Sequence, residues 1–101
     1  MTVGLRVLVS ERAADQVQRR ATWWQENRPA APGAVAIDFG EAVKLLAEQL
    51  GIGAKYEGAR TPGVRRLYLS RLEYFIYYRT DATTLQILAF WDASRGTQPR
   101  T

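Results

Sequence analysis

The sequence predicts an α+β domain in which a helical hairpin covers one face of a single sheet. Apolar residues recur at helical spacing through the first half of the chain, and three short alternating segments with brief connections follow in the second half. Short connections are typical of an antiparallel meander. Because the chain has 101 residues, one domain spanning residues 1–101 is expected, since two separate cores would each be too small.

The first half begins with a predicted strand over residues 3–9, which are short and rich in β-branched side chains. Ser10 follows as an N-cap for a helix. This helix is expected to end near Asn27, because the residue before Pro29 is disfavoured in the α region. Its apolar stripe comprises Ala14, Val17, Ala21 and Trp24.

A second helix is predicted after the connector at residues 29–33, with Pro32 opening it. Gly51 is a natural C-terminal stop. Gly40 lies inside this helix, and its lack of a side chain is expected to permit a close approach to the first helix. The apolar stripe comprises Val35, Phe39, Ala42, Leu46 and Leu50.

The second half is predicted to contain an irregular loop over residues 52–63 and three strands over residues 64–70, 73–79 and 84–91. The tail from residue 92 onward has few apolar residues and is predicted to be partly mobile. Alternation divides the side chains between two faces. The face under the helices is expected to hold Leu67, Leu69, Tyr74, Ile76 and Tyr78. The open face is expected to hold Arg66, Tyr68, Phe75, Tyr77 and Arg79. The last strand is apolar on both sides, with Ile87 and Ala89 opposite Leu88 and Phe90.

Positive charge is concentrated in the second half of the chain. Up to Gly51 there are six basic and six acidic residues, whereas from Ile52 onward eight basic residues face four acidic ones, which accounts for the net charge of +4. Seven of those eight are arginine, which favours planar contacts to phosphate or carboxylate. An anionic partner and a solubilising basic surface are both consistent with this excess.

The composition also limits the chemistry. Cysteine and histidine are both absent, so neither disulfides nor the commonest metal ligands are available, and no metal or other cofactor is expected. The sequence contains neither a signal-peptide pattern nor an apolar run long enough to span a membrane. A cytoplasmic protein is therefore expected.

Three segments, in order, resemble the RelE/ParE toxin superfamily. They are the strand end and helix start at residues 9–15, the arginine-led strand at residues 64–69 with the "Tyr-x-Ile-x-Tyr" pattern at residues 74–79, and the final strand with its terminal arginine at residues 87–96. The likeness covers about residues 3–96. It implies a bacterial plasmid-stabilisation toxin of a type II toxin–antitoxin system, neutralised by a cognate antitoxin protein.

The resemblance leaves two targets open, because RelE-like members cleave mRNA on the ribosome and ParE-like members inhibit DNA gyrase. Nuclease members often carry histidine or tyrosine just after the last strand, where this chain has Asp92. RNA cleavage requires a base, an acid and cations around the phosphate. The presence of Asp92 in place of histidine or tyrosine favours the ParE-like branch, and a binding activity over catalysis. If the chain is an endoribonuclease, its candidate residues are Lys55, Arg65, Arg79, Asp92 and Arg95.

For a gyrase-directed toxin, the predicted target-binding surface combines arginines with aromatic side chains. These residues are Arg65, Arg66, Tyr68, Arg71, Tyr77, Arg79 and Arg95. Trp23 and Trp24 are the candidate antitoxin contacts, with one expected in the core and the other exposed, because protein interfaces favour tryptophan. Two non-toxic alternatives are a sheet that stacks RNA bases on Tyr68, Phe75 and Tyr77, and an adaptor domain.

Overall fold

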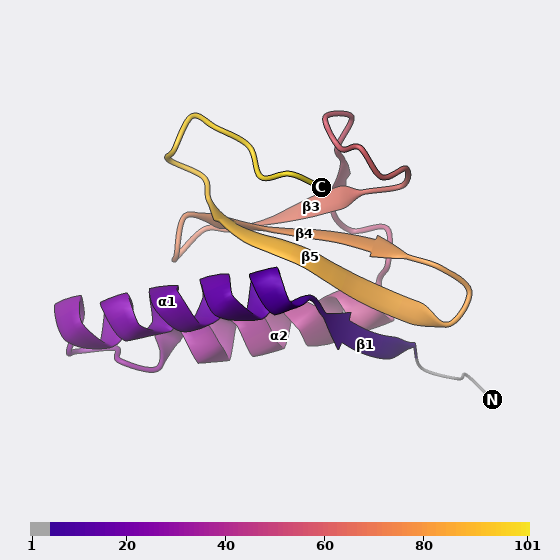
Figure 1. Ribbon diagram of the computed structural model, residues 1–101. Coiled ribbons are helices and arrows are strands. Elements are labelled where there is room, and N and C mark those ends of the chain that lie inside the picture. Colours follow the sequence, from indigo (N-terminus) through magenta and orange to yellow (C-terminus); the bar gives the residue numbers. More distant parts are fainter. Residues whose placement is uncertain (1–4) are drawn as a thin grey trace.

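The computed structural model describes residues 5–101, which form two helices and one five-stranded sheet (Figure 1). The elements in chain order are β1 (Arg6–Val9), α1 (Glu11–Asn27), α2 (Ala34–Glu48), β2 (Ala54–Lys55), β3 (Arg65–Leu69), β4 (Tyr74–Thr80) and β5 (Thr84–Asp92). Both helices cover the same face of the sheet. The predicted α+β class and the helical hairpin are therefore confirmed. The first two residues of the predicted strand over residues 3–9 lie outside the described residues.

Helix α1 begins and ends where the sequence predicts. The Ser10 side chain accepts a hydrogen bond from the backbone N of Ala13 at 3.0 Å, which satisfies one of the first amide groups of the helix. The helix ends at Asn27, two residues before Pro29. The buried stripe differs by one position, because Ala13 is fully buried and Ala14 is exposed. One residue is about 100° of helix rotation, enough to turn Ala14 toward solvent.

Helix α2 is shorter than predicted at both ends. It begins at Ala34, so Pro32 lies in the preceding turn and does not open the helix. It ends at Glu48, and Leu50 lies beyond it with 36% of its surface exposed. The close approach predicted at Gly40 is wrong, because a Cβ atom there would have no neighbour within 4 Å among residues 5–101 other than the local backbone of α2.

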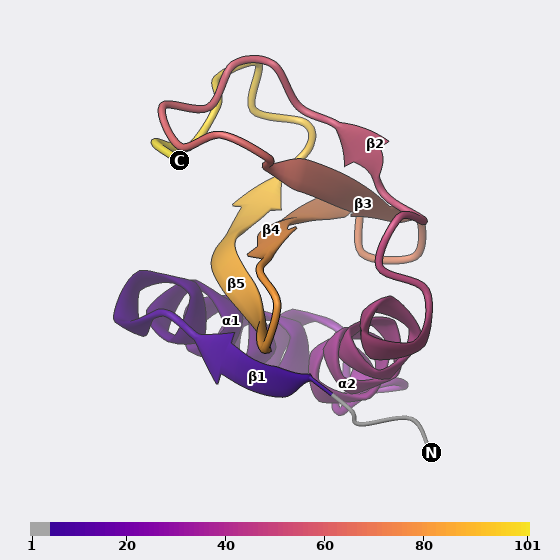
Figure 2. The same ribbon diagram turned by 90° about the vertical axis from the view of Figure 1, so that its right-hand side faces the viewer.

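The strand order is β1-β5-β4-β3-β2, with β1 parallel to β5 and the other pairs antiparallel (Figure 2). The predicted meander of β3, β4 and β5 is confirmed. Strand β2 lies inside the predicted irregular loop and pairs Ala54 with Arg66 and Lys55 with Arg65. Two residues are too few to show alternation, so only the partner strand makes β2 recognisable.

A bulge in β5 changes which side chains share a face. Tyr77 pairs with Ala89 whereas Tyr78 pairs with Ile87, so Leu88 is an additional residue in β5. Ile87 and Phe90 consequently both join the core under the helices, and Ala89 joins the opposite cluster. The prediction that Ile87 and Ala89 share a face is therefore wrong, because simple alternation does not allow for an extra residue.

The main core lies between the helices and the sheet. Its fully buried side chains include Val35, Leu46, Ile76, Tyr78 and Leu85, and the partly buried Leu67, Leu69 and Tyr74 pack against them. All five residues predicted for the helix-covered face belong to this core. Within residues 5–101, neither helix is both long and apolar enough to cross a membrane.

The opposite face of the sheet is covered rather than open. Val64, Tyr77 and Ala89 form a small buried cluster there, and Tyr77 has no exposed surface. The segment after β5 returns over this side, where the backbone N of Thr61 donates to the carbonyl O of Thr101 at 3.2 Å. The expectation that Tyr77 lies on an open face is therefore wrong, because loop and tail segments cover it. The mobility of the tail stays a prediction.

Candidate functional site

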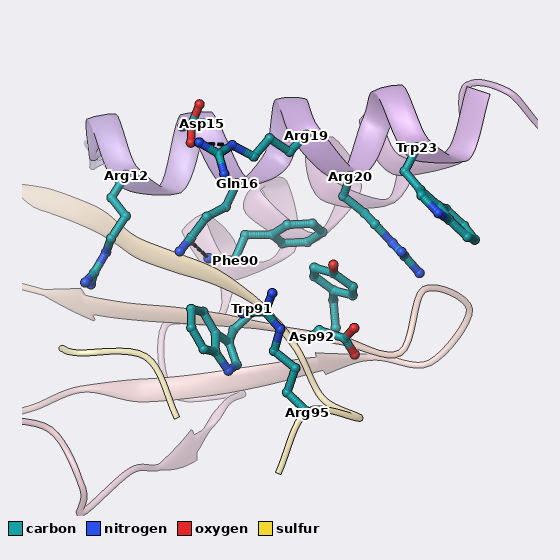
Figure 3. A pocket seen from close by; sticks show the side chains of 11 residues that line it. Arg12, Asp15, Gln16, Arg19, Arg20, Trp23, Phe90, Trp91, Asp92 and Arg95 are labelled. Atoms are coloured by element: carbon teal, nitrogen blue, oxygen red, sulfur yellow. Dashed lines mark hydrogen bonds and ion pairs between the residues drawn. The ribbon is translucent and has the colours of Figure 1, made fainter. Parts of the chain in front are cut away.

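A cleft of about 400 Å³ lies between α1 and the C-terminal end of β5 (Figure 3). It brings together Trp23, a predicted antitoxin contact, with Asp92 and Arg95, which belong to the candidate nuclease residues. We call it the α1–β5 cleft and define it by its lining residues. Those from α1 are Arg12, Asp15, Gln16, Arg19, Arg20 and Trp23, and those from the sheet and tail are Tyr74, Phe90, Trp91, Asp92 and Arg95.

Helical spacing directs one side of α1 toward the cleft, because residues three and four apart lie on the same helix face. Gln16 anchors that face to β5, since its side-chain carbonyl accepts a hydrogen bond from the backbone N of Phe90 at 2.8 Å. The Ser10 hydroxyl donates to the carbonyl O of Leu88 at 3.1 Å. The N-cap residue of α1 thus satisfies the carbonyl group of the bulge residue in β5. This hydrogen bond holds α1 against β5.

Two of the four arginines in the cleft already have polar partners. The Arg12 guanidinium donates to the carbonyl O of Arg100 and, at 3.5 Å, to that of Leu88. Arg19 forms an ion pair with Asp15 at 2.9 Å. This is an exposed pair spaced four residues apart along the helix, of a kind that contributes little to stability. These two arginines are engaged within the chain.

The other two arginines are held by aromatic rings instead. The Arg20 guanidinium lies 4.1 Å from the ring centre of Trp23 and 4.9 Å from that of Tyr74, and Arg95 lies 4.9 Å from that of Trp91. The buried Nε of Arg20 has no hydrogen-bond partner among residues 5–101. Stacking fixes the plane of a guanidinium but leaves its in-plane N–H groups as donors.

Asp92, a candidate residue for RNA cleavage at the end of β5, has a lowered pKa. Burial by itself would raise this pKa. The hydrogen bonds from the backbone N and hydroxyl of Ser94, at 2.9 and 2.6 Å, and the charges of Arg20 and Arg95 outweigh burial. A general acid or base works best with a pKa near the operating pH. Asp92 is therefore an ionised cap for the turn that follows β5 and is poorly suited to proton transfer.

Tyr74 forms part of the cleft wall, packed against Phe90 with ring centres 4.5 Å apart. Burial raises the pKa of its hydroxyl, and this effect exceeds the opposing effect of the Arg20 charge. The phenol therefore stays protonated at neutral pH. Tyr74 contributes a neutral, aromatic surface to the cleft.

Several predicted site residues have internal structural contacts elsewhere. Arg65 donates to the carbonyl O of Gly53 at 2.7 Å, and so holds the segment that follows α2. Arg71 pairs through its Nε with Asp38 of α2 at 2.9 Å. The first contact joins β3 to the segment after α2, and the second joins the β3–β4 connection to α2 itself. Removing either arginine is therefore expected to affect the fold as well as any surface.

The remaining predicted residues lie on the side of the sheet opposite the helices or at its edge. Arg66 lies 4.2 Å from the ring centre of Phe75 and donates to the Tyr77 hydroxyl at 3.1 Å. Tyr68 is 47% exposed beside Phe75. Lys55 is exposed on β2, while Arg79 is partly buried on β4. The candidate nuclease residues therefore do not form one site, because Asp92 and Arg95 line the α1–β5 cleft whereas Lys55, Arg65 and Arg79 lie outside it.

Trp24 is only 8% exposed and belongs to the core, so Trp23, at 37%, is the tryptophan that is available to a partner.

Sequence reasoning missed the contribution of Arg12, Arg20 and Trp91 to the cleft. The sequence predicts no role for the polar residues of α1. The spacing of these polar residues shows which of them share one side of α1. It does not show that the end of β5 faces that side of the helix.

No family model and no curated protein matches the sequence. Among solved structures, the fold matches a chain of the chromosomal ParDE TA system from P. aeruginosa with a TM-score of 0.73 and 23% sequence identity. The match covers 89% of this chain and 97% of that chain. The predicted resemblance to ParE-like toxins is thus confirmed at the level of the fold.

Proposed function

We propose that this chain is the toxin of a type II toxin–antitoxin system, that it is ParE-like, and that a cognate antitoxin protein neutralises it. The observation that carries the proposal is the fold shared with a chain of a ParDE TA system over 89% of this chain. A cytoplasmic location in a bacterial cell, and a role in plasmid stabilisation, belong to the same proposal.

We further propose DNA gyrase as the target, because the candidate nuclease residues lack a suitable proton carrier. The lowered pKa of Asp92 supports a binding activity. Lys55 and Arg95 lie in different cavities, which also argues against a single cationic site around one phosphate. RelE-like mRNA cleavage is the alternative against which the target must be tested.

The proposed target-binding surface retains Arg66, Tyr68, Arg79 and Arg95 from the predicted set, none of which is fully buried. Tyr77 is excluded because it is fully buried. Arg65 and Arg71 are expected to support this surface indirectly through their contacts to Gly53 and Asp38. A non-toxic RNA-binding sheet would need exposed aromatic rings on which bases can stack. Of the three predicted rings, only Tyr68 is exposed, because Tyr77 is buried and Arg66 lies over the Phe75 ring.

The proposal is tested by expressing the chain in bacteria with and without the neighbouring reading frame. Growth arrest that the neighbour relieves is the expected result, and normal growth without the neighbour would contradict a toxin. Purified protein should then inhibit supercoiling by gyrase, whereas cut mRNA on stalled ribosomes would identify the RelE-like alternative.

A variant series locates the surface. Tyr68→Ala and Arg95→Ala are expected to lower toxicity while the protein stays folded, because both side chains are exposed. Lys44→Ala on α2 removes an exposed charge away from the surface and is the matched control. Full toxicity in both Tyr68→Ala and Arg95→Ala would show that the toxin acts through another surface.

A further inference from the structure

The α1–β5 cleft carries more positive than negative charge. Four arginines and two aspartates line it, which leaves a net charge of +2. Arg12 and Arg19 have partners within the chain, whereas Arg20 forms no ion pair or hydrogen bond among residues 5–101. A guanidinium that is partly withdrawn from water without a polar partner is unfavourable, so an additional anion would be stabilised at this position.

The walls of the cleft are aromatic. Trp23 and Tyr74 flank the Arg20 guanidinium. Phe90 and Trp91 continue the wall toward Arg95 (Figure 3). Aromatic and arginine side chains are enriched in the centres of protein interfaces. The combination fits a ligand that presents an acidic group next to an apolar one.

We propose that the α1–β5 cleft is a carboxylate-binding site that receives an acidic residue and an adjacent aromatic or aliphatic residue from a segment of the antitoxin. The carboxylate lies between Arg20 and Arg95, and the apolar neighbour packs on Trp23 and Tyr74. The identity of the partner rests on the proposed function, whereas the chemistry of the site rests on the cleft alone.

A carboxylate fits better than a phosphate because Asp15 and Asp92 also line the cleft. A phosphate dianion would face both aspartates with twice the charge of a carboxylate, so like-charge repulsion disfavours it more strongly. A single carboxylate can form paired, parallel hydrogen bonds with one guanidinium. The donors available to it are the N–H groups of Arg20 and Arg95 and the amide NH₂ of Gln16, whose carbonyl is already used by Phe90.

The first experiment measures antitoxin binding to Arg20→Gln, with Arg60→Gln as the matched control. Arg60 is an exposed arginine outside the cleft, so both variants lose the same charge. Arg20→Gln is expected to weaken binding about tenfold or more, and Arg60→Gln less than about threefold. Equal binding by the two variants would overturn the proposal. If Arg20→Gln does not fold, Arg95→Gln, in the exposed tail, takes its place.

The second experiment does not depend on the toxin function. N-acetyl-aspartyl-phenylalanine amide is titrated into the protein, and backbone amide shifts are followed by NMR. Shifts centred on Arg20, Trp23 and Tyr74 are expected, and they should be lost when asparagine replaces the aspartate of the peptide. The site stands on that result even if expression causes no growth arrest.

Two results would overturn the site while leaving the proposed function intact. One is growth arrest relieved by an antitoxin whose affinity is unchanged in the Arg20→Gln and Arg95→Gln variants. The other is a short oligothymidylate that shifts the same cleft amides at lower concentration than the peptide, which would identify a phosphate site.

Discussion

The two faces of the sheet bury tyrosines that are neighbours in sequence but differ in what covers them. Tyr78 lies under the helices in the large core, and Tyr77 lies on the opposite face under loop and tail segments. Both are fully buried. The hydroxyl of Tyr78 contacts backbone groups, accepting from the N of Gly53 and donating to the O of Leu50, each at 2.9 Å, whereas that of Tyr77 contacts the side chains of Arg66 and Gln98.

The two faces of the sheet therefore differ in how firmly their buried side chains are held. Helices supply a continuous apolar layer, so the core under them is fixed by many buried side chains. The opposite cluster is small and depends on the segments around residues 56–64 and 93–101, which have little regular structure. Substitutions on the two faces should therefore have unequal effects on stability.

The largest effect is expected for Ile76→Ala on the helix-covered face. The side chain is fully buried and central in the main core. Truncation should lower the free energy of unfolding by about 2–5 kcal/mol, because it removes buried apolar surface and leaves a cavity. Urea unfolding followed by circular dichroism measures the loss. Phe75→Ala on the opposite face is the comparison, and an equal or larger loss there would contradict the difference between the faces.

A smaller effect is expected from removing single hydroxyl groups. Tyr78→Phe leaves the amide of the buried Gly53 without its partner, which should cost about 1–3 kcal/mol in unfolding free energy. Tyr77→Phe should cost about 0.5–1.5 kcal/mol, because the freed Gln98 side chain is exposed and can bind water. Paired urea titrations measure both values. A larger loss for Tyr77→Phe would reverse the expected order.

Removing residues 97–101 should affect mainly the face opposite the helices, although it also removes the carbonyl O of Arg100 to which Arg12 of α1 donates. The deletion removes Gln98 and the carbonyl O of Thr97, which accepts from the Trp91 indole at 2.9 Å. We expect a red-shifted tryptophan emission and faster amide exchange around Tyr77, with unchanged exchange in α2. Unchanged exchange around Tyr77 would instead support the predicted mobility of the tail, because a mobile tail would not protect that face.

The smallest effect concerns acid pH and the turn between β4 and β5. Backbone hydrogen bonds from Thr83 and Thr84 to the carboxylate lower the pKa of Asp81 to about 2. Because the folded pKa is below the ordinary value of 3.8, the stabilisation is complete above about pH 5 and is lost as pH falls toward 2. The stability advantage over Asp81→Asn should shrink through this range in thermal unfolding. A constant difference from pH 5 to 2 would contradict the lowered pKa.

Much of the fold could be predicted because it depends on local patterns. The N-cap at Ser10, the end of α1 before Pro29 and the three meander strands follow from residue type and spacing. The helix-covered face also follows, because alternation decides it within each strand. Strand β2 and the bulge at Leu88 could not be predicted, since each is defined by its partner strand.

The sequence by itself determined the α+β class, the order of the elements apart from β2, and the arginine-rich second half. Only the tertiary structure placed α1 against the end of β5, and so joined Arg20 and Trp23 to Arg95 in one cleft. It also buried Tyr77 beneath the tail. The physical reason is the same in both cases: these are contacts between residues more than 20 positions apart, and their energies depend on how the elements pack rather than on local spacing.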